Sequence, residues 1–515
     1  MVVNVVKKNL YMDSVFLMSL SSRIKKMSGV EDVSVMMGTP ENKKILSNAG
    51  LLAKDGQSAQ PNDLVIALKI KSDIVKKQAL QRIEQLLSQT EEEEKEEKER
   101  EITSTDEALR EYRNANLVQI SIPGPYVRRE AEKAILNGKN VFIFSDNVPV
   151  SDEVFLKKLG KRKGVLVMGP DCGTAIINGI GLGFANAVPR GDIGMVGAAG
   201  TGIQEVTSII ANYGCGISHA IGTGGRDLKK EVGGITMDAG ISLLAKDSRT
   251  KVIVLVSKIP SPEVKSKILS KVFSIKKPFV ILFLGKDYTE GEKKNVYFVK
   301  TLEDAAKCAV AISKGQRFNS TEFDEPLNKI KEKAKNLRKK LSPSQKFLRA
   351  LYSGGTLCNE ANLILTEKGI KFFSNVPLEN SQVLKNLEKS KGNTTLDMGD
   401  DYFTVGTPHP MIDFTKRNQR ILQEANDPRT AVILLDAVLG YGAHPDPASA
   451  FFPAIKQAKT KAKKQNREII FITSITGTDL DPQNRARQKE KFEKMGVGVF
   501  PTNAQAVRFA SMLIK

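Results

Sequence analysis

The chain has 515 residues, 41% of them hydrophobic, which is enough apolar material for several packed domains, roughly three to five. The net charge of +20 comes largely from lysines in helix-like segments such as 329–340 and 456–464, and only 6% of residues are aromatic, so the sequence does not predict a nucleic-acid partner. No apolar run is long enough to span a bilayer, and residues 1–14 lack the apolar core of a signal peptide. We therefore expect a cytoplasmic protein with no membrane partner.

The cysteines and histidines predict neither a disulfide framework nor a metal site. The four cysteines form no Cys-x-x-Cys pair, and the three histidines have no metal-binding spacing. Solvated lysine-rich faces explain the excess positive charge, with a small anionic substrate or an acidic partner as the alternative.

Residues 1–90 predict a small, ferredoxin-like α+β module with no catalytic cluster. Strand-like and helix-like segments alternate there, at 2–6, 14–27, 30–36, 64–70 and 74–87. Residues 91–102 are mostly glutamate and lysine, which cannot bury a core and predict a charged linker or a helical spacer.

Residues 103–191 alternate strand-like and helix-like segments with short loops, which is typical of parallel strands in a Rossmann-like sheet. The strand-like segments are 117–122, 141–145 and 165–168, and the helix-like ones are 125–136 and 152–159. Ligands of such sheets bind at the carboxyl ends of the strands, where Gly169-Pro170-Asp171-Cys172 falls.

One phrase then occurs twice, as Gly200-Thr201-Gly202-Ile203-Gln204-Glu205 and as Gly355-Thr356-Leu357-Cys358-Asn359-Glu360. Each copy follows a strand-like segment and opens a helix-like one. Glycines let the backbone approach a ligand closely, and the free N–H groups of a first helical turn attract an anion. We expect phosphate to bind at Gly200, Thr201, Gly202, Gly355 and Thr356, either in two sites or in one site made from two halves. A capped helix needs the same residues for stability alone.

The duplication extends beyond this phrase. Asp247-Ser248-Arg249-Thr250 and Asp427-Pro428-Arg429-Thr430 each precede a strand-like run. The Gly-Thr phrases lie 155 positions apart and the Asp-x-Arg-Thr phrases 180, so the later unit carries an insertion of 25 residues. We predict two related flavodoxin-like α/β units, 192–316 and 343–515, joined by a basic connector at 317–342.

Several polar residues are candidates for the chemistry. Arg226 has a guanidinium that suits a carboxylate or phosphate, and His409 and His444 lie in Gly- and Pro-rich loops from which an acid or base can act. A local ion pair and packed loop histidines are the structural alternatives. The candidate substrate-binding residues are Gly224, Gly225, Asp227, Asp397 and Asp400. Asp397 and Asp400, with Asp401, could instead cap backbone donors, and no metal is predicted there.

The motifs resemble the succinyl-CoA synthetase family. Gly169-Pro170-Asp171-Cys172, the first Gly-Thr phrase and Gly222-Thr223-Gly224-Gly225 look like its α-subunit, while Leu396-Asp397-Met398-Gly399-Asp400-Asp401 and Val432-Ile433-Leu434-Leu435-Asp436 resemble the ligase domain of its β-subunit. Their combination in one chain, with Gly406-Thr407-Pro408-His409-Pro410, is similar to the FdrA family of acyl-CoA-synthetase-like proteins over residues 110–515. The resemblance implies that 103–191 is a CoA-binding-like half-Rossmann domain and that the two later units are ligase-type domains.

Departures from the synthetase change the expected reaction. The Gly-rich nucleotide loop and the ATP-grasp domain have no counterpart, the stretch 284–290 lacks the phosphohistidine, and Lys258 replaces the glutamate that holds it. Two phosphate-binding phrases without a phosphohistidine imply that the acceptor substrate attacks an acyl phosphate directly. The FdrA resemblance implies an oxamate carbamoyltransferase in allantoin and ureide breakdown, with carbamoyl phosphate as co-substrate and with partner subunits or a homo-oligomer. The alternatives are an acyl-CoA ligase that binds CoA and uses a separate ATP-grasp subunit, and a non-catalytic regulatory or scaffold subunit.

Overall fold

The computed structural model describes residues 1–95, 102–285 and 291–514. Its N-terminal module is an antiparallel sheet in the order β1 (Val2–Lys7), β3 (Leu64–Ile70), β2 (Val30–Met37). Helices α1 (Ser14–Lys25) and α4 (Asp73–Lys95) pack on one face, and α2 (Pro40–Asn48) and α3 (Lys54–Gln57) lie on the side of the other. The predicted α+β module is confirmed. Residues 91–95 of the expected linker belong to α4, and 96–101 lie outside the described residues.

Residues 102–168 form the next layer, after a short helix α5 (Thr105–Glu111). Three parallel strands lie in the order β4 (Leu117–Ile120), β5 (Asn140–Ile143), β6 (Val167–Met168), connected by α6 (Gly124–Leu136) and α7 (Val150–Lys163). The predicted Rossmann-like alternation is confirmed. The loops that follow β5 and β6 carry Asp146 and Asp171 at the carboxyl edge of this sheet.

The first repeat unit is built on an eight-stranded sheet whose central strands are parallel. Two of its strands come from residues 174–183, so the sheet extends beyond the predicted bounds 192–316. In spatial order the strands are β13 (Gly291–Lys293), β14 (Val296–Phe298), β12 (Phe279–Leu284), β11 (Val252–Lys258), β9 (Arg190–Gly197), β10 (Ile217–Gly222), β7 (Thr174–Ile177) and β8 (Ile180–Gly183). Helices α8 (Gly200–Asn212) and α11 (Leu302–Ser313) cover one face, and α9 (Ile235–Lys246) and α10 (Pro262–Ser274) the other.

The second repeat unit contains six parallel strands, in the order β16 (Phe372–Ser374), β17 (Asn393–Asp397), β15 (Phe347–Tyr352), β18 (Thr430–Val438), β19 (Ile470–Thr476), β20 (Gly498–Phe500). Helices α12 (Leu327–Arg338), α13 (Gly355–Glu367) and α18 (Asn503–Leu513) cover one face. Helices α15 (Thr415–Asn426), α16 (Pro447–Lys464) and α17 (Arg485–Lys494) cover the other, and the short α14 (Asp401–Thr404) follows β17.

The two units share a strand plan that differs by one strand. In each, a central strand (β9 or β15) runs into the Gly-Thr helix, and a parallel neighbour (β10 or β17) lies beside it. The second unit has two strands between α13 and α15, where the first has only β10 between α8 and α9. This additional strand lies within the insertion that the sequence predicts. Gly222 pairs with Gly197 as Asp397 pairs with Tyr352, so Gly222 and Asp397 occupy equivalent positions.

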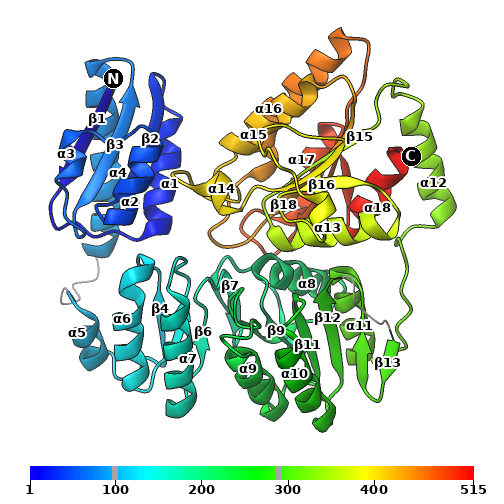
Figure 1. The fold of residues 1–515 in the computed structure, drawn as a ribbon, viewed down its shortest axis with the longest axis horizontal. Coiled ribbons are helices and arrows are strands. Elements are labelled where there is room, and N and C mark those ends of the chain that lie inside the picture. The colour runs from blue at the N-terminus through cyan, green and yellow to red at the C-terminus, as the bar shows by residue number, and fades with distance from the viewer. Residues whose placement is uncertain (96–101, 286–290, 515) are drawn as a thin grey trace.

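The two units are joined through one continuous hydrophobic core. Helices α8, α13 and α18 lie between the two sheets (Figure 1), and their apolar side chains belong to a single buried cluster. Two buried glutamates cross this junction. Glu205 of α8 accepts a hydrogen bond from the backbone N–H of Asn503, at the start of α18, and Glu360 of α13 accepts one from the N–H of Leu302, at the start of α11. Each unit therefore caps a helix of the other.

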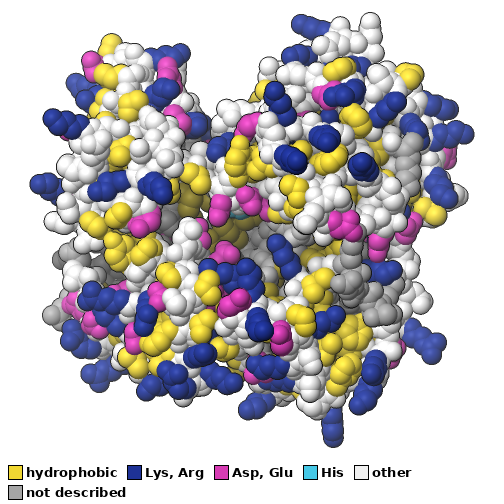
Figure 2. Space-filling view, in the orientation of Figure 1, with side chains coloured by type: hydrophobic (Ala, Val, Ile, Leu, Met, Phe, Trp, Pro, Cys, Tyr) yellow, Lys and Arg dark blue, Asp and Glu magenta, His cyan; other side chains and the backbone are white. Residues whose placement is uncertain are grey.

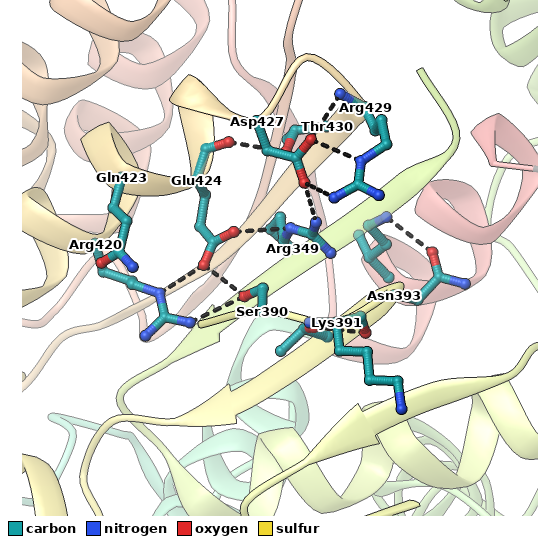
Figure 3. A network of polar contacts seen from close by, with 12 residues as sticks. Arg349, Ser390, Lys391, Asn393, Arg420, Gln423, Glu424, Asp427, Arg429 and Thr430 are labelled. Carbon is teal, nitrogen blue, oxygen red and sulfur yellow. Dashed lines mark hydrogen bonds and ion pairs between the residues drawn. The ribbon is translucent and has the colours of Figure 1, made fainter. Parts of the chain in front are cut away.

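The repeated Asp-x-Arg-Thr phrase lies at the opposite end of the sheets. Asp427 ends α15 and accepts hydrogen bonds from Arg429 and from the buried Arg349 of β15 (Figure 3). Arg349 also pairs with Glu424 at 2.7 Å. Asp247 ends α9 in the same way and accepts from Thr250 at 2.7 Å. These contacts fix the start of β11 and β18, so the phrase has a structural role.

Within residues 1–95, 102–285 and 291–514, no helix combines the length and the apolar content that a bilayer span requires.

The buried glutamates predict a pH-dependent stability. Burial raises the pKa of Glu360 from 4.5 to about 8, and burial also raises the pKa of Glu205. The folded state thus keeps a proton that the unfolded chain loses above about pH 4.5, so stability falls as pH rises from there to about 8, by up to about 1.4 kcal/mol per pH unit for one proton. We expect Glu360→Gln to flatten this decline, as measured by thermal unfolding at pH 5.5 to 8.5. Parallel curves for the two proteins would contradict the assignment.

Candidate functional site

The two Gly-Thr phrases meet each other at the junction of the two units. A Cβ atom placed on Gly354 would lie 2.9 Å from Cγ2 of Thr201, and one placed on Gly202 would lie 3.0 Å from Cγ2 of Thr356. Each threonine therefore packs on a glycine at the start of the other helix, Thr201 on Gly354 just before α13 and Thr356 on Gly202. The structure brings the first turns of α8 and α13 together in one chain, which is the arrangement expected for one site made from two halves.

Neither helix start is capped by a side chain. The residues that precede α8 and α13, Ala199 and Gly354, make no side-chain cap. Among the described contacts, no acceptor takes the backbone N–H groups of residues 200–202 or 355–357. Two helix dipoles thus point their positive ends into one small region, which favours an anion there.

A buried carboxylate holds the loop in front of α13. Asp436, at the end of β18, accepts hydrogen bonds from the backbone N–H groups of Ser353 and Gly354 and from the Ser353 hydroxyl. On its other side, it accepts one from Arg417 at 2.5 Å. Both side chains are fully buried, and Arg417 lies over the ring of Phe451. Neither residue was a candidate from the sequence, because a pair 19 positions apart has no local pattern.

Asp397 lies directly over the start of α13. A Cβ atom on Gly355 would lie 2.5 Å from Oδ2 of Asp397, and Oδ1 accepts a hydrogen bond from the N–H of Gly399 at 2.9 Å. Burial raises the pKa of Asp397 to about 7, Asp400 adds to the increase, and Lys258 of the first unit opposes it. Asp400 itself caps the short α14 by accepting from the N–H of Tyr402.

The two candidate histidines are neutral and have the same tautomer. Nδ1 of His409 accepts a hydrogen bond from the N–H of Met411, and Nδ1 of His444 accepts one from Asp446 at 3.0 Å, so Nε2 carries the proton in each. Burial, followed by the charge of Arg417, lowers the pKa of His409 to about 4. Its Nε2 lies 2.8 Å from the Cβ position of Gly399, beside Asp397. Burial also lowers the pKa of His444, whose ring packs edge-on against Phe414.

Arg226 and Asp227 lie apart from this junction, in a buried chain of ions. Arg226 pairs with Glu153 at 2.9 Å, Glu153 with Lys157 at 2.9 Å, and Lys157 with Asp227 at 2.8 Å. Asp227 also accepts from the N–H groups of Thr236 and Met237 at the start of α9, so it serves the fold. Gly224 lies against the backbone of the cis Gly169-Pro170 turn, and its neighbour Gly225 is close to Asp171.

A second polar region lines a recess between the modules. Figure 2 shows this recess near the middle of the visible face, with acidic side chains around it. Burial raises the pKa of Asp171 to about 6, and the charges of Asp146 and Asp401 add to the increase. Burial and Asp401 likewise raise the pKa of Asp146. The carboxyl edge of the three-stranded sheet is therefore acidic.

No group of three or more His, Cys, Asp or Glu side chains in the described part of the chain is arranged to hold a metal ion. The site residues thus fall into two groups. Gly200, Thr201, Gly202, Gly355, Thr356, Asp397 and His409 are brought together, whereas Arg226 and Asp227 belong to the buried ion chain, His444 lies beside Phe414 and Asp400 caps α14.

Three family models match the chain. Residues 1–104 match "AllF, heavy metal-associated domain", residues 190–285 match "CoA binding domain" and residues 351–513 match "CoA-ligase". Residues 1–104 contain neither cysteine nor histidine, the ligands that heavy metals take most readily, so they do not fit a metal site of that kind.

Curated relatives match over different lengths. The uncharacterized protein YahF of Escherichia coli (strain K12) is 42% identical over 495 residues, covering 96% of this chain and 95% of that protein. The succinate–CoA ligase [ADP-forming] subunit alpha of Aquifex aeolicus is 29% identical over 163 residues, covering 30% of this chain and 52% of that subunit. The corresponding subunit of Methanothermobacter thermautotrophicus is 25% identical over 196 residues, covering 38% and 65%. The likeness to the ligase subunits is thus partial, and the likeness to YahF spans both chains.

The contact between the two helix starts predicts that a methyl group added to Gly354 lowers the affinity for phosphate. We expect Gly354→Ala to push Thr201 away and separate the two helix starts, and therefore to weaken binding of inorganic phosphate at least tenfold. Isothermal titration calorimetry measures the affinity. Gly498→Ala, where the new Cβ meets only ordinary contacts, is the control. Unchanged affinity in Gly354→Ala would contradict an anion site at this contact.

The buried ion chain predicts a loss of stability. Lys157→Met leaves Asp227 buried without a cation and Glu153 with Arg226 alone, and breaking a buried pair in this way costs about 3–5 kcal/mol. Thermal unfolding should show the loss, whereas Lys158→Met, on the exposed side of the same helix, should be nearly neutral. Equal effects of the two changes would show that the chain of ions contributes little.

Proposed function

The chain belongs to the FdrA family, together with YahF, and carries CoA-ligase-type domains, and we propose that it is the subunit of an acyl-phosphate-using transferase. The proposed reaction moves a carbamoyl group from carbamoyl phosphate to oxamate, which gives oxalurate and phosphate. It places the protein in allantoin or ureide breakdown.

The observation that carries the proposal is the contact between two uncapped helix starts. The phosphate of an acyl phosphate binds at this contact through backbone N–H groups and a threonine hydroxyl, that of Thr201 or that of Thr356. The same donors stabilise the charge that grows on the phosphate as it leaves. Because the two halves belong to one chain, the donor and the acceptor can be held against each other without a second copy.

The histidines favour direct transfer over a phosphohistidine relay. A phosphoryl acceptor needs a free imidazole nitrogen, but Nδ1 of His409, His444 and His219 each accepts a backbone N–H. His409, which lies nearest the junction, presents Nε2–H and can donate a hydrogen bond to the substrate. Residues 286–290, which complete the stretch equivalent to the phosphohistidine loop, contain no histidine and lie outside the described residues.

The acidic recess supports the same choice. The diphosphate of CoA needs cations or open helix starts, whereas the carboxyl edge of the three-stranded sheet carries Asp146 and Asp171, faced by Asp401. The neighbouring cation Arg226 is already paired with Glu153. The residues at this edge therefore do not fit a CoA diphosphate, whereas the residues that match the CoA binding domain model, 190–285, include the start of α8. The proposed reaction has no step through CoA. The ligase relatives are named as subunits, and we propose that this chain also works with partner subunits.

The test is phosphate release from carbamoyl phosphate in the presence of oxamate and co-purified subunits. We expect the double variant Thr201→Val, Thr356→Val to lower kcat/KM at least tenfold, since a hydrogen bond to a charged group contributes about 1.5–3 kcal/mol. Valine keeps the methyl groups that pack on Gly354 and Gly202, so the change isolates the hydroxyls. Thr366→Val, at the far end of α13, is the control. An unchanged rate in the double variant would refute the proposal.

The second candidate function is an acyl-CoA ligase that works with a separate ATP-grasp subunit, and the matches to the CoA binding domain and CoA-ligase models favour it. It requires a phosphorylated enzyme intermediate and CoA binding. Labelling with γ-³²P-ATP in the presence of partner subunits separates the two functions. A stable phosphoenzyme would support the ligase, and activity of the complex without this chain would support a scaffold.

A further inference from the structure

The two helix starts at the junction are not equivalent. At the end of β10, beside the start of α8, the first unit has Gly222, which adds no side chain. At the same register position, beside the start of α13, the second unit has Asp397. At this position the start of α8 faces no carboxylate, because Sγ of Cys172 and the carbonyl of Thr174 fill the space beside Gly222. The start of α13 already faces a carboxylate of the protein.

Asp397 has the geometry of a reactive group rather than of a cap. The side chain is 9% exposed, and only Oδ1 has a donor, the N–H of Gly399. No described residue donates to Oδ2, although this atom lies over Gly355, one residue from the contact between Thr201 and Gly354. The carboxylate of a residue that is only 9% exposed is thus directed at the junction, and its Oδ2 has no donor among the described residues.

The charges around Asp397 come from four elements and a loop. Its own strand β17 contributes no other charge near it. The titratable or charged groups that face it are Lys258 at the end of β11, Asp400 before α14, Asp436 at the end of β18, Cys358 on α13, and His409 in the loop before α15. Burial together with two carboxylates outweighs the hydrogen bond from Gly399 and the charge of Lys258, so the pKa of Asp397 lies at about 7. A carboxyl of this kind can gain and lose a proton near neutral pH.

We propose, on the basis of the proposed function, that Asp397 is the general base for the acceptor and that the start of α8 alone binds the phosphate. A second phosphate at α13 would be placed against the carboxylate of Asp397, which like-charge repulsion disfavours. The acceptor that fits beside Oδ2 is instead a group with an N–H to donate. The primary amide of a small carboxylate such as oxamate is of this class.

The step balances without a further reactant. Oδ2 of Asp397 takes one proton from the amide nitrogen of the acceptor, and the nitrogen electron pair forms the new C–N bond to the carbamoyl carbon. The bond from that carbon to the phosphate oxygen breaks, and phosphate leaves with the electron pair toward the N–H groups of α8. The proton on Asp397 then passes to solvent or to the phosphate, which restores the base.

Binding of inorganic phosphate tests the assignment without any turnover. We expect one phosphate per chain by isothermal titration calorimetry, weakened at least tenfold by Thr201→Val and by less than twofold by Thr356→Val. Asp397→Asn should bind phosphate at least as tightly as the wild type, because a nearby negative charge is removed. Two phosphates per chain, or equal losses in the two threonine variants, would overturn the assignment of α8 as the phosphate site.

Kinetics test the role of Asp397. Since the base must be deprotonated, kcat of the wild type should fall as pH drops through about 7. Asp397→Asn should lower kcat by about 10²-fold or more, leave the KM for carbamoyl phosphate within twofold, and remove this limb of the pH profile. Glu360→Gln removes a different buried carboxyl, on α13, and kcat of this variant should still fall as pH drops through about 7. An Asp397→Asn enzyme with the wild-type pH profile would refute the proposal.

A second variant, Gly355→Ala, tests the same role of Asp397 if Asp397→Asn does not fold. In Gly355→Ala the new Cβ displaces the carboxylate of Asp397, although the residue itself is unchanged. The fall of kcat at low pH should therefore shift or disappear, while one phosphate per chain still binds. A Gly355→Ala enzyme whose limb is unchanged would contradict the role of Asp397. If the wild type transfers no carbamoyl group to oxamate, the proposed function fails, and phosphate stoichiometry with the two threonine variants still decides which helix start binds the anion.

Discussion

The structure depends on two helices that begin against each other. Thr201 packs on Gly354 and Thr356 on Gly202, and this reciprocal contact is possible only because two of the four positions have no side chain. Two positive dipole ends at such close range repel each other. The second unit offsets this with its own carboxylates, Asp436 below the loop and Asp397 above the helix start. The first unit has no carboxylate at the position equivalent to Asp397, so an external anion has most to contribute at α8.

Buried charge in this protein is used mainly to fix loops. Asp436 and Arg417 orient the residues before α13, and Asp227 and Lys157 orient the start of α9. In each case a carboxylate accepts several backbone N–H groups and a buried cation balances it, which recovers much of the cost of removing the ions from water. Asp397 differs, because no described residue donates to one of its oxygens and Lys258, the cation that lowers its pKa, belongs to the other unit.

The N-terminal module is attached near the segment that carries His409. Ser22 of α1 donates a hydrogen bond to Asp413 at 2.9 Å, and Ile45 of α2 lies close to Gly406. The N-terminal module thus contacts residues 406–413 on one side of this segment, and Gly399, next to Asp397, contacts His409 on the other. The absence of cysteine and histidine from residues 1–104 leaves such docking as the role that the module's described contacts support.

The α/β class, the N-terminal module, the parallel Rossmann-like strands and the internal duplication were predictable from the sequence, because they depend on local hydrophobic period and on repeated phrases. The spacing of the repeats also predicted an insertion of 25 residues, and the structure shows an added strand in that part of the second unit. Three features emerged only from the folded structure: the two Gly-Thr phrases face each other, Asp397 lies at the position equivalent to Gly222, and Arg417 and Asp436 support the loop before α13. These facts depend on strand order and on contacts between distant residues, which no local pattern encodes. For the same reason Arg226, which the sequence favoured as catalytic because arginine suits anions, lies in a buried ion pair with Glu153, a partner 73 positions away in another layer.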